Sequence, residues 1–247
     1  MWDDARQMNA LSVTLALIAL LGVACATVVW FVRQPAFALR EVAIMSPLLR
    51  TNAAYLETVI RDDLAGTFFT LDLARARNAL RQVPWVRDVA LRRQWPHRLE
   101  LTIDEHQPLA RWNDNALVST RGEVFVARAD DELPLFEGPE GTAADMLARY
   151  RAWNGDLQPL GLSIREIRMS PRGGWRLKTV GAAGPLTVEL GRDEPGERLA
   201  RFVAAHARTL GALARAGTRV DTVDLRYRNG FAARIPAFRE KNARPAA

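Results

Sequence analysis

The sequence predicts an α+β protein with a single N-terminal transmembrane helix, a β-α-α-β-β domain and a mostly antiparallel β-domain with flanking helices. Three observations lead to this fold class. Residues 10–32 are apolar and uncharged, residues 37–106 combine strand-like and helix-like hydrophobic periods, and residues 107–236 contain mainly short apolar runs separated by turn residues. With 49% hydrophobic residues, the chain can build packed cores.

The apolar run at 10–32 reads ALSVTLALIALLGVACATVVWFV and contains neither charge nor proline. A bilayer core of about 30 Å needs about 20 apolar residues of helix, so the run is long enough to span. A cleaved signal peptide is the alternative, but its apolar core is typically only about 7–15 residues long. The small residues at 24–26 that resemble a cleavage site lie inside the run. We therefore expect residues 10–32 to remain as a membrane anchor.

A span close to the N-terminus, followed by one large domain region, is typical of a signal anchor. This predicts a short cytoplasmic tail over residues 1–9 and an exported C-terminal part. Arg33 and Arg40 favour the opposite orientation, because Lys and Arg near a span concentrate on the cytoplasmic side. The local charges alone therefore do not decide the orientation.

The β-α-α-β-β domain follows from hydrophobic periodicity and from residues that begin or end helices. Its predicted elements are strand 37–44, helix 51–64, helix 70–82, strand 86–94 and strand 98–105. Thr51-Asn52 caps the first helix, Gly66 ends it, and Thr70 or Asp72 begins the second. Pro84 closes the second helix because proline cannot continue the hydrogen-bond ladder. Val89 is expected to face the core from a central strand.

The β-domain follows from short apolar runs between Gly, Pro and Asn residues. Its predicted elements are strands 109–112, 116–119, 124–126 and 133–136, helix 142–158, strands 164–169, 175–180 and 186–190, helix 197–216, and strands 220–227 and 231–235. Thr142 is expected to cap the first of these helices. Asn229-Gly230 predicts a two-residue hairpin turn, Pro236 ends the last strand, and residues 237–247 form a flexible polar tail.

Residues with catalytic or metal-binding potential are sparse. Cys25 is the single cysteine and lies in the apolar run, so the remaining chain offers no disulfide or thiol nucleophile. His97, His106 and His206 have no ligand neighbours at metal-site spacing, and each is interpreted as a surface or capping residue. Asp104-Glu105 is interpreted as solvated surface, because adjacent strand residues point to opposite faces. The sequence therefore predicts no enzyme activity, no cofactor and no metal.

The formal net charge of +6 is carried by residues 192–247, which contain twelve Arg or Lys and six Asp or Glu. Elsewhere the two signs are interleaved, as on an ordinary solvated surface, which argues against nucleic acid as a partner. The basic C-terminal part favours an acidic protein partner or anionic lipid headgroups, and solubility explains it equally well.

Binding is the remaining kind of function, and the last strand is the strongest candidate surface. Because it follows a tight turn and stops at Pro236, the strand 231–235 is expected to lie at a sheet edge. An edge strand presents unpaired N–H and C=O groups and can accept a strand from another chain.

The segment VPWVRDVALRRQWPHRLELTIDEHQPLARW, residues 83–112, resembles the FtsQ/DivIB family of bacterial cell-division proteins, and the resemblance extends over residues 11–235. It implies that residues 37–106 form a POTRA (polypeptide-transport-associated) domain and that residues 107–236 form the family's β-domain. It also implies a non-enzymatic divisome scaffold at the division septum, with an N-terminus in the cytoplasm and both domains in the periplasm. The implied partners are FtsB and FtsL, other divisome membrane proteins and inner-membrane lipid, without nucleic acid or a small-molecule substrate.

The resemblance also implies a partner-binding site. The motif V-D-L-R-Y-x-x-G-x-A begins at Val223, and in it Tyr227 and Arg226 match the family's partner-binding tyrosine and its neighbouring arginine. Arg172 matches a second basic contact, whereas Ile235 stands where the family has a tryptophan. The expected partner-binding residues are Arg172, Arg226, Tyr227, Asn229, Gly230, Phe231, Ala232, Ala233 and Ile235. Two alternatives remain: a POTRA-bearing transport or secretion component, and a membrane-anchored envelope enzyme.

Overall fold

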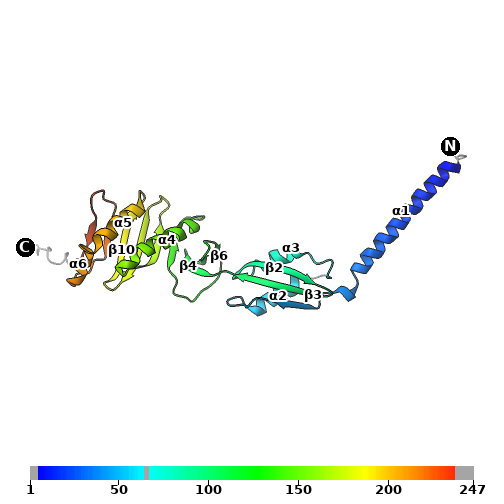
Figure 1. Cartoon of the computed structure of the whole chain (residues 1–247), viewed down its shortest axis with the longest axis horizontal. Helices are drawn as coiled ribbons and strands as arrows, with labels where there is room; N and C mark the ends of the chain where they lie inside the picture. Colours follow the sequence, from blue (N-terminus) through cyan, green and yellow to red (C-terminus); the bar gives the residue numbers. More distant parts are fainter. Residues whose placement is uncertain (1–4, 64–66, 237–247) are drawn as a thin grey trace, which may run out of the picture. The chain divides into compact units, whose positions relative to one another are not determined.

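The computed structural model describes residues 5–63 and 67–236, and the chain divides into two compact units between Glu105 and His106. The first unit opens with α1 (Ala5–Val32; Figure 1). Within the described residues, Asn9–Val32 is the one helical stretch that is long and apolar enough to cross a membrane. At about 1.5 Å per residue it measures about 36 Å, which exceeds the bilayer core of about 30 Å.

The rest of the first unit is a three-stranded sheet that packs against two helices, as Figure 1 shows. Its elements are β1 (Glu41–Ile44), α2 (Ala53–Asp63), α3 (Leu73–Leu80), β2 (Val86–Gln94) and β3 (Arg98–Glu105). The strand order is β1-β3-β2, with β1 parallel and β2 antiparallel to β3. The predicted order of strand, helix, helix, strand, strand is confirmed.

The beginning of this unit differs from the prediction. The strand predicted over 37–44 is confirmed only for Glu41–Ile44, because the chain first forms a 3-10 helix, η1 (Pro35–Phe37), whose first position is proline. The side chain of Asn52 caps α2 by accepting hydrogen bonds from the N–H groups of Ala54 and Tyr55. Gly66, which was expected to end that helix, lies outside the described residues.

The second helix begins where its polar cap predicts. The carboxylate of Asp72 accepts hydrogen bonds from the N–H groups of Ala74 and Arg75, at 2.9 and 3.0 Å. α3 then ends at Leu80 rather than at residue 82. Val89 is 1% exposed and faces the core as predicted, but its strand β2 is an edge strand. The expected central position is wrong because β1 returns parallel to β3 and places β3 in the middle.

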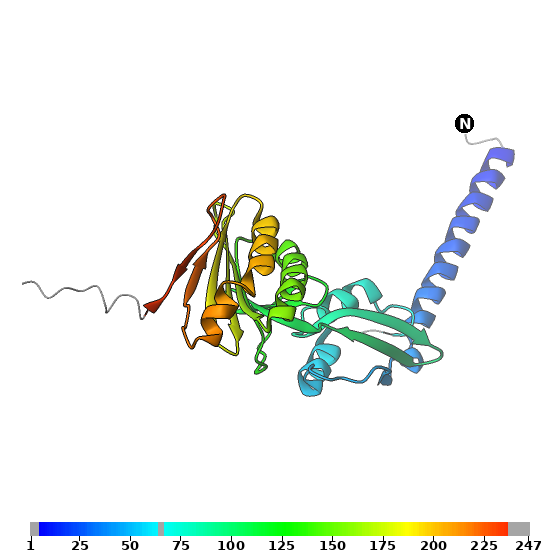
Figure 2. The ribbon, with the colours of Figure 1, turned by 60° about the vertical axis from the view of Figure 1, so that its left-hand side comes forward.

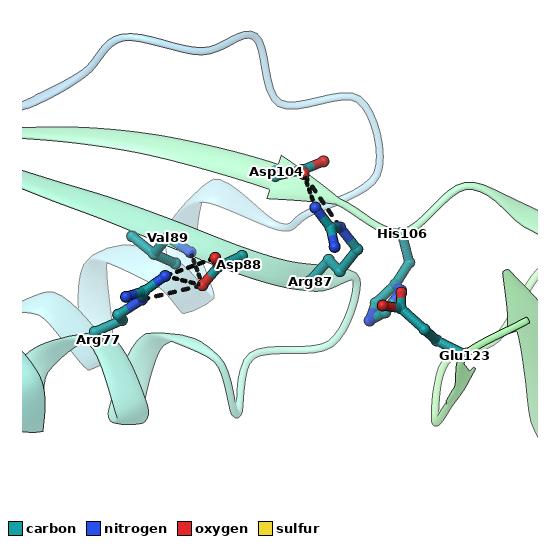
Figure 3. Close-up of polar contacts among 7 residues, drawn as sticks. All are labelled: Arg77, Arg87, Asp88, Val89, Asp104, His106 and Glu123. Atoms are coloured by element: carbon teal, nitrogen blue, oxygen red, sulfur yellow. Dashed lines mark hydrogen bonds and ion pairs between the residues drawn. The ribbon is translucent and has the colours of Figure 1, made fainter. Parts of the chain in front are cut away.

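The two neighbouring carboxylates at the end of β3 have different environments. Asp104 pairs across the sheet with the guanidinium of Arg87 (Figure 3), as an ordinary surface carboxylate does. Glu105 instead accepts hydrogen bonds from the backbone N–H groups of Leu49, Arg50 and Thr51, at 3.0, 3.1 and 2.8 Å. The interpretation of Glu105 as solvated surface is therefore wrong, because three amides of a distant turn converge on it.

Glu105→Gln is expected to lower the free energy of unfolding of the first unit by about 2 kcal/mol. The amide has only one oxygen that can accept hydrogen bonds from the three backbone N–H groups, and its NH₂ group, itself a donor, faces N–H donors. Burial raises the pKa of Glu105, but the hydrogen bonds from the 49–51 segment outweigh it and the net pKa is lowered. The carboxylate therefore stabilises the fold above its unfolded-state pKa, and this contribution is lost as the pH falls through the lower folded-state pKa.

Urea unfolding followed by circular dichroism, at neutral and acidic pH, measures this effect. Asp104→Asn is the matched control, because its half-exposed ion pair should contribute less than about 1 kcal/mol. Equal stabilities of the two variants at neutral pH would contradict the role assigned to Glu105.

The second unit is built on a nine-stranded sheet with the order β12-β11-β10-β9-β8-β7-β4-β5-β6. Its strands are β4 (Pro108–Trp112), β5 (Ala116–Ser119), β6 (Val124–Phe125), β7 (Leu135–Glu137), β8 (Ser163–Met169), β9 (Trp175–Gly181), β10 (Gly184–Gly191), β11 (Thr222–Asp224) and β12 (Ala232–Arg234). Its helices are α4 (Ala143–Leu157), η2 (Gln158–Leu160), α5 (Pro195–His206) and α6 (Leu210–Arg215). Three strand pairs are parallel and the others antiparallel, so the mostly antiparallel sheet is confirmed.

The two faces of this sheet differ in chemistry. On one face, buried residues of the strands, such as Leu177, Val188 and Val223, form a single core with Leu199 and Phe202 of α5. The other face carries cross-strand ion pairs, which join Arg168 to Glu137, Lys178 to Glu166 and Arg176 to Glu189. Because charged pairs cover the second face, the helices α4 and α5 pack on the apolar one (Figure 2).

Two predicted features of the helices are wrong. The helix predicted over 197–216 is split into α5 and α6, because Thr209 leaves the helical region and its hydroxyl donates to the carbonyl of Ala205 at 2.9 Å. Thr142 precedes α4, but its hydroxyl donates to the carbonyl of Pro139 at 2.6 Å instead of capping the helix. Both threonines satisfy their hydroxyls on nearby backbone carbonyls.

Candidate functional site

β12 is the edge strand of the nine-stranded sheet. It pairs antiparallel with β11 on one side, and no other strand of the described chain pairs with its second side. Ala232, Ala233 and Arg234 are all exposed. In an antiparallel pair, the residues that do not exchange hydrogen bonds with the partner point their N–H and C=O groups away from it. The outer side of β12 can therefore accept a further strand.

The connection between β11 and β12 is longer than predicted. The strand expected over 220–227 contains only Thr222–Asp224, and seven residues separate it from β12, so the two-residue turn at Asn229-Gly230 is wrong. Leu225 is buried and its N–H donates to the carbonyl of Glu189 at 2.8 Å, which holds the connection against β10. The buried Leu225 prevents the strands from closing directly into a tight hairpin.

Phe231 fixes the other end of this connection. Its ring packs edge-on against the ring of Phe202, with 5.9 Å between centroids, and the side chain belongs to the edge of the domain core. The sequence left open whether this ring faces solvent or a partner, and the structure places it against α5. Phe231 therefore supports the site from within.

Tyr227 stands in the exposed middle of the connection, with 58% of its surface accessible. Arg226, its neighbour, is engaged with Asp224: its Nη2 and Nε donate to the carboxylate at 2.6 and 2.9 Å, and its own N–H donates at 3.0 Å. The hydrogen bond from Arg226 lowers the pKa of Asp224, and the pKa of Arg226 is raised in return. The aromatic ring is thus open to a partner, whereas the arginine is already paired.

Arg172 lies in the turn between β8 and β9, at the same end of the sheet. The N–H of Ser170 donates to the carbonyl of Gly174 and closes the turn. The turn lies beside Arg192, because a Cβ atom added to Gly173 would stand 3.3 Å from Cγ of Arg192. A Cβ at Gly191 would in turn meet Cγ of Arg226 at 3.0 Å. The structure therefore brings the Arg172 turn, Arg192 and Arg226 together. The sequence missed Arg192. The antiparallel pairing of β9 with β10 places it beside the Arg172 turn, and the parallel pairing of β10 with β11 adds Arg226.

Five of the six other predicted residues line two separate hollows, and the sixth, Ala232, is exposed on β12. Asn229, Gly230 and Phe231 border a cavity of about 300 Å³ beside α5, together with Arg198, Arg201 and Arg228. Ala233 and Ile235 border a groove of about 1090 Å³ that also includes Lys178 and Thr187 on the charged face of the sheet. Arg198 and Arg201 are three residues apart on α5, a spacing that the sequence shows, but their position beside residues 229–231 depends on the fold.

The histidines and carboxylates of the described residues form no group of three or more that could hold a metal ion. His106 stacks on the ring of Phe125, with 4.2 Å between centroids, and its Nδ1 lies 3.5 Å from the carboxylate of Glu123 (Figure 3). His206 contacts the ring of Phe202, and burial lowers its pKa. His106 and His206, which were expected to be surface or capping residues, are therefore partly buried and make packing contacts, and His206 lies in the last turn of α5.

Comparisons with known proteins identify the family. Residues 37–106 match the family described as "POTRA domain, FtsQ-type", and residues 110–226 match "Cell division protein FtsQ/DivIB, C-terminal". The chain is 39% identical to Cell division protein FtsQ of Burkholderia pseudomallei over 97% of this chain and 96% of the relative. The chain belongs to the FtsQ/DivIB family. The FtsQ of Nitrosospira multiformis is 35% identical over 95% of this chain and 99% of that protein.

Membership in the FtsQ/DivIB family supports a role for this chain in the divisome, and the apolar α1 agrees with a membrane-anchored member. The sheet and helices within residues 37–106 of the first unit thus form a POTRA domain of the FtsQ type. The second match ends at residue 226, so Tyr227 and β12 lie outside the matched segment.

Proposed function

We propose that this chain is a non-enzymatic scaffold of the bacterial divisome that binds FtsB, and FtsL with it, through the outer edge of β12. The partner adds a strand to β12, and Tyr227 anchors it. The partner-binding residues of this proposal are Arg172, Arg226, Tyr227, Asn229, Gly230, Ala232, Ala233 and Ile235, with Phe231 supporting them from the core. The chain would link early and late division proteins at the septum.

The observation that carries the proposal is the edge itself. β12 is a short strand with three exposed residues and an unpaired side in the described chain, and a tyrosine that is 58% exposed lies five residues before it. Natural proteins usually shield such an edge, and β-strand addition is a recurrent use of one that is left open. Family membership supports the divisome as the setting.

Tyr227→Ala is expected to weaken binding of an FtsB peptide by about 2 kcal/mol or more, roughly 30-fold in Kd, because exposed tyrosines are enriched among interface hot spots. Titration calorimetry of the full chain with a peptide from the periplasmic part of FtsB measures this. Tyr55→Ala is the matched control, since Tyr55 is 51% exposed on α2 of the other unit. Equal affinities for wild type, Tyr227→Ala and Tyr55→Ala would show that the partner surface lies elsewhere.

The proposal also fixes the topology: residues 1–9 in the cytoplasm, residues 10–32 across the inner membrane, and the POTRA domain (37–106), the β-domain (107–236) and the tail (237–247) in the periplasm. A reporter enzyme that is active only after export, fused after Ala247, is expected to be active. The physical reason is that a near-N-terminal span precedes one large folded region. Activity of a cytosolic reporter alone at this position would reverse the orientation, in agreement with Arg33 and Arg40.

A further inference from the structure

The loop that precedes α3 is attached directly to the end of α1. The hydroxyl of Thr67 donates to the carbonyl of Val32, the last residue of α1, at 2.9 Å. The N–H of Phe68 donates to the carbonyl of Phe37 at 2.7 Å. The ring of Phe37 lies between those of Phe31 and Phe69, with centroid distances of 5.1 and 5.2 Å. An aromatic cluster therefore begins in the last turn of the apolar helix and ends in this loop.

The hairpin between β2 and β3 lies at the same end of the POTRA domain. The N–H of Arg40 donates to the carbonyl of His97 at 3.0 Å, and Arg98 pairs with Glu41 at 3.2 Å. Arg93 donates to the carbonyl of Leu71, which ties the hairpin to the loop that carries Phe69. Since only seven residues lie between Val32 and Arg40, Arg40 and the carbonyl of His97 that it bonds stay within about 30 Å of the end of α1, even along a fully extended chain.

The side chains exposed at this end are those that bilayer interfaces favour. Trp95, at the hairpin tip, is 72% exposed, and Phe69 is 45% exposed. Tryptophan is enriched at the headgroup level, where its ring is apolar and its N–H can bond to water or lipid. Arg33 and Arg40 are exposed, and neither forms an ion pair within the described residues. Basic side chains near a membrane surface attract anionic lipid headgroups.

We infer that these four residues, Arg33, Arg40, Phe69 and Trp95, form a membrane-contacting rim that docks the POTRA domain onto the bilayer crossed by α1. Trp95 and Phe69 enter the headgroup region, and the two arginines face lipid phosphates. The inference rests on the membrane anchorage in the proposed function, but it is independent of FtsB binding. It gives the POTRA domain a fixed position at the membrane surface.

The test uses the full chain in nanodiscs of phosphatidylcholine and phosphatidylglycerol, with an NBD fluorophore on one cysteine. Gln94→Cys in a Cys25→Ser background places the probe beside Trp95 and leaves the tryptophan in place. Leu49→Cys in the same background is the control, because Leu49 is 83% exposed and its N–H bonds Glu105 at the opposite end of β3. A probe on native Cys25 reports whether α1 is inserted.

Lipids with a spin label near the headgroup are expected to quench the probe at residue 94 and to leave the probe at residue 49 accessible to aqueous iodide. Trp95→Ser in the Gln94→Cys chain should transfer the probe to the aqueous phase, and circular dichroism should show an unchanged fold because Trp95 is exposed. Iodide quenching at residue 94 as strong as at residue 49 would overturn the rim, as would lipid quenching that Trp95→Ser leaves unchanged.

The probe on Cys25 separates this inference from the proposed function. If lipid spin labels deep in the bilayer quench Cys25 while residue 94 stays aqueous, the anchor is correct and the rim is wrong. If Cys25 itself is not quenched, the membrane anchorage fails and the rim fails with it. FtsB-peptide affinity of Trp95→Ser is expected to equal that of wild type, because Trp95 and β12 belong to different units.

Discussion

Val89→Asp is expected to abolish the cooperative unfolding transition of the POTRA domain near the wild-type temperature. Val89 is 1% exposed and stands opposite Ile103 of β3, inside the cluster that α2 and α3 cover. A carboxylate in this apolar site must be buried unpaired or protonated, and either costs several kcal/mol. A domain of this size is stabilised by only about 5–15 kcal/mol, so the loss is a large part of the total.

The adjacent residue supplies the control for this prediction. Ala90 lies on the same strand but is exposed, so Ala90→Asp changes the charge of β2 equally without burying it. Thermal unfolding followed by circular dichroism should show a POTRA transition for Ala90→Asp and none for Val89→Asp, with the β-domain transition retained in both. A normal POTRA transition for Val89→Asp would mean that the faces of β2 are inverted.

Proline substitutions at neighbouring positions of β12 are expected to separate partner binding from folding. Residues of an antiparallel pair alternately exchange hydrogen bonds with the partner strand and point away from it. One of Ala232 and Ala233 therefore donates to β11, and the other points its N–H to the free edge. Proline has no backbone N–H, and its ring occupies the place of that hydrogen. At the position whose N–H points to the free edge, proline should therefore lower the affinity for the FtsB peptide at least about tenfold.

Proline at the other of the two alanines, whose N–H bonds β11, serves as the internal control for folding. Proline at the residue that bonds β11 should lower the free energy of unfolding by about 1–3 kcal/mol, because it leaves a carbonyl of β11 without its donor. Calorimetry with the FtsB peptide and thermal unfolding of both variants provide the two readouts. If Ala232→Pro and Ala233→Pro both fold and bind like wild type, no strand is added at β12.

Local signals in the sequence were sufficient for most elements of the fold. The alternation in residues 98–105 located β3 at its observed bounds, and Asn52 and Asp72 marked the starts of α2 and α3. The burial of Val89 followed from the apolar positions of the strand predicted over 86–94. These features depend on neighbouring residues alone, and for this reason periodicity and capping residues predicted them.

Features that depend on distant parts of the chain were not predictable. The parallel pairing of β1 with β3 moved Val89 to an edge strand, and the parallel pairing of β10 with β11 brought Arg226 beside Gly191. The convergence of three backbone amides on Glu105 joins residues more than fifty positions apart. At the candidate site, the edge position of the last strand was predicted correctly, but the seven-residue connection and the Asp224–Arg226 pair were not.

The Asp224–Arg226 pair determines how the partner affinity of an Arg226→Ala variant must be interpreted. A partner carboxylate that reaches Arg226 has to displace Asp224, so one ion pair is exchanged for another and little net affinity follows from the charge. Arg226→Ala also leaves the partly buried carboxylate of Asp224 without its guanidinium in the unbound chain. Weaker binding by this variant would therefore combine a lost contact with a reorganised free state, and a double-mutant cycle with Asp224→Asn would separate the two.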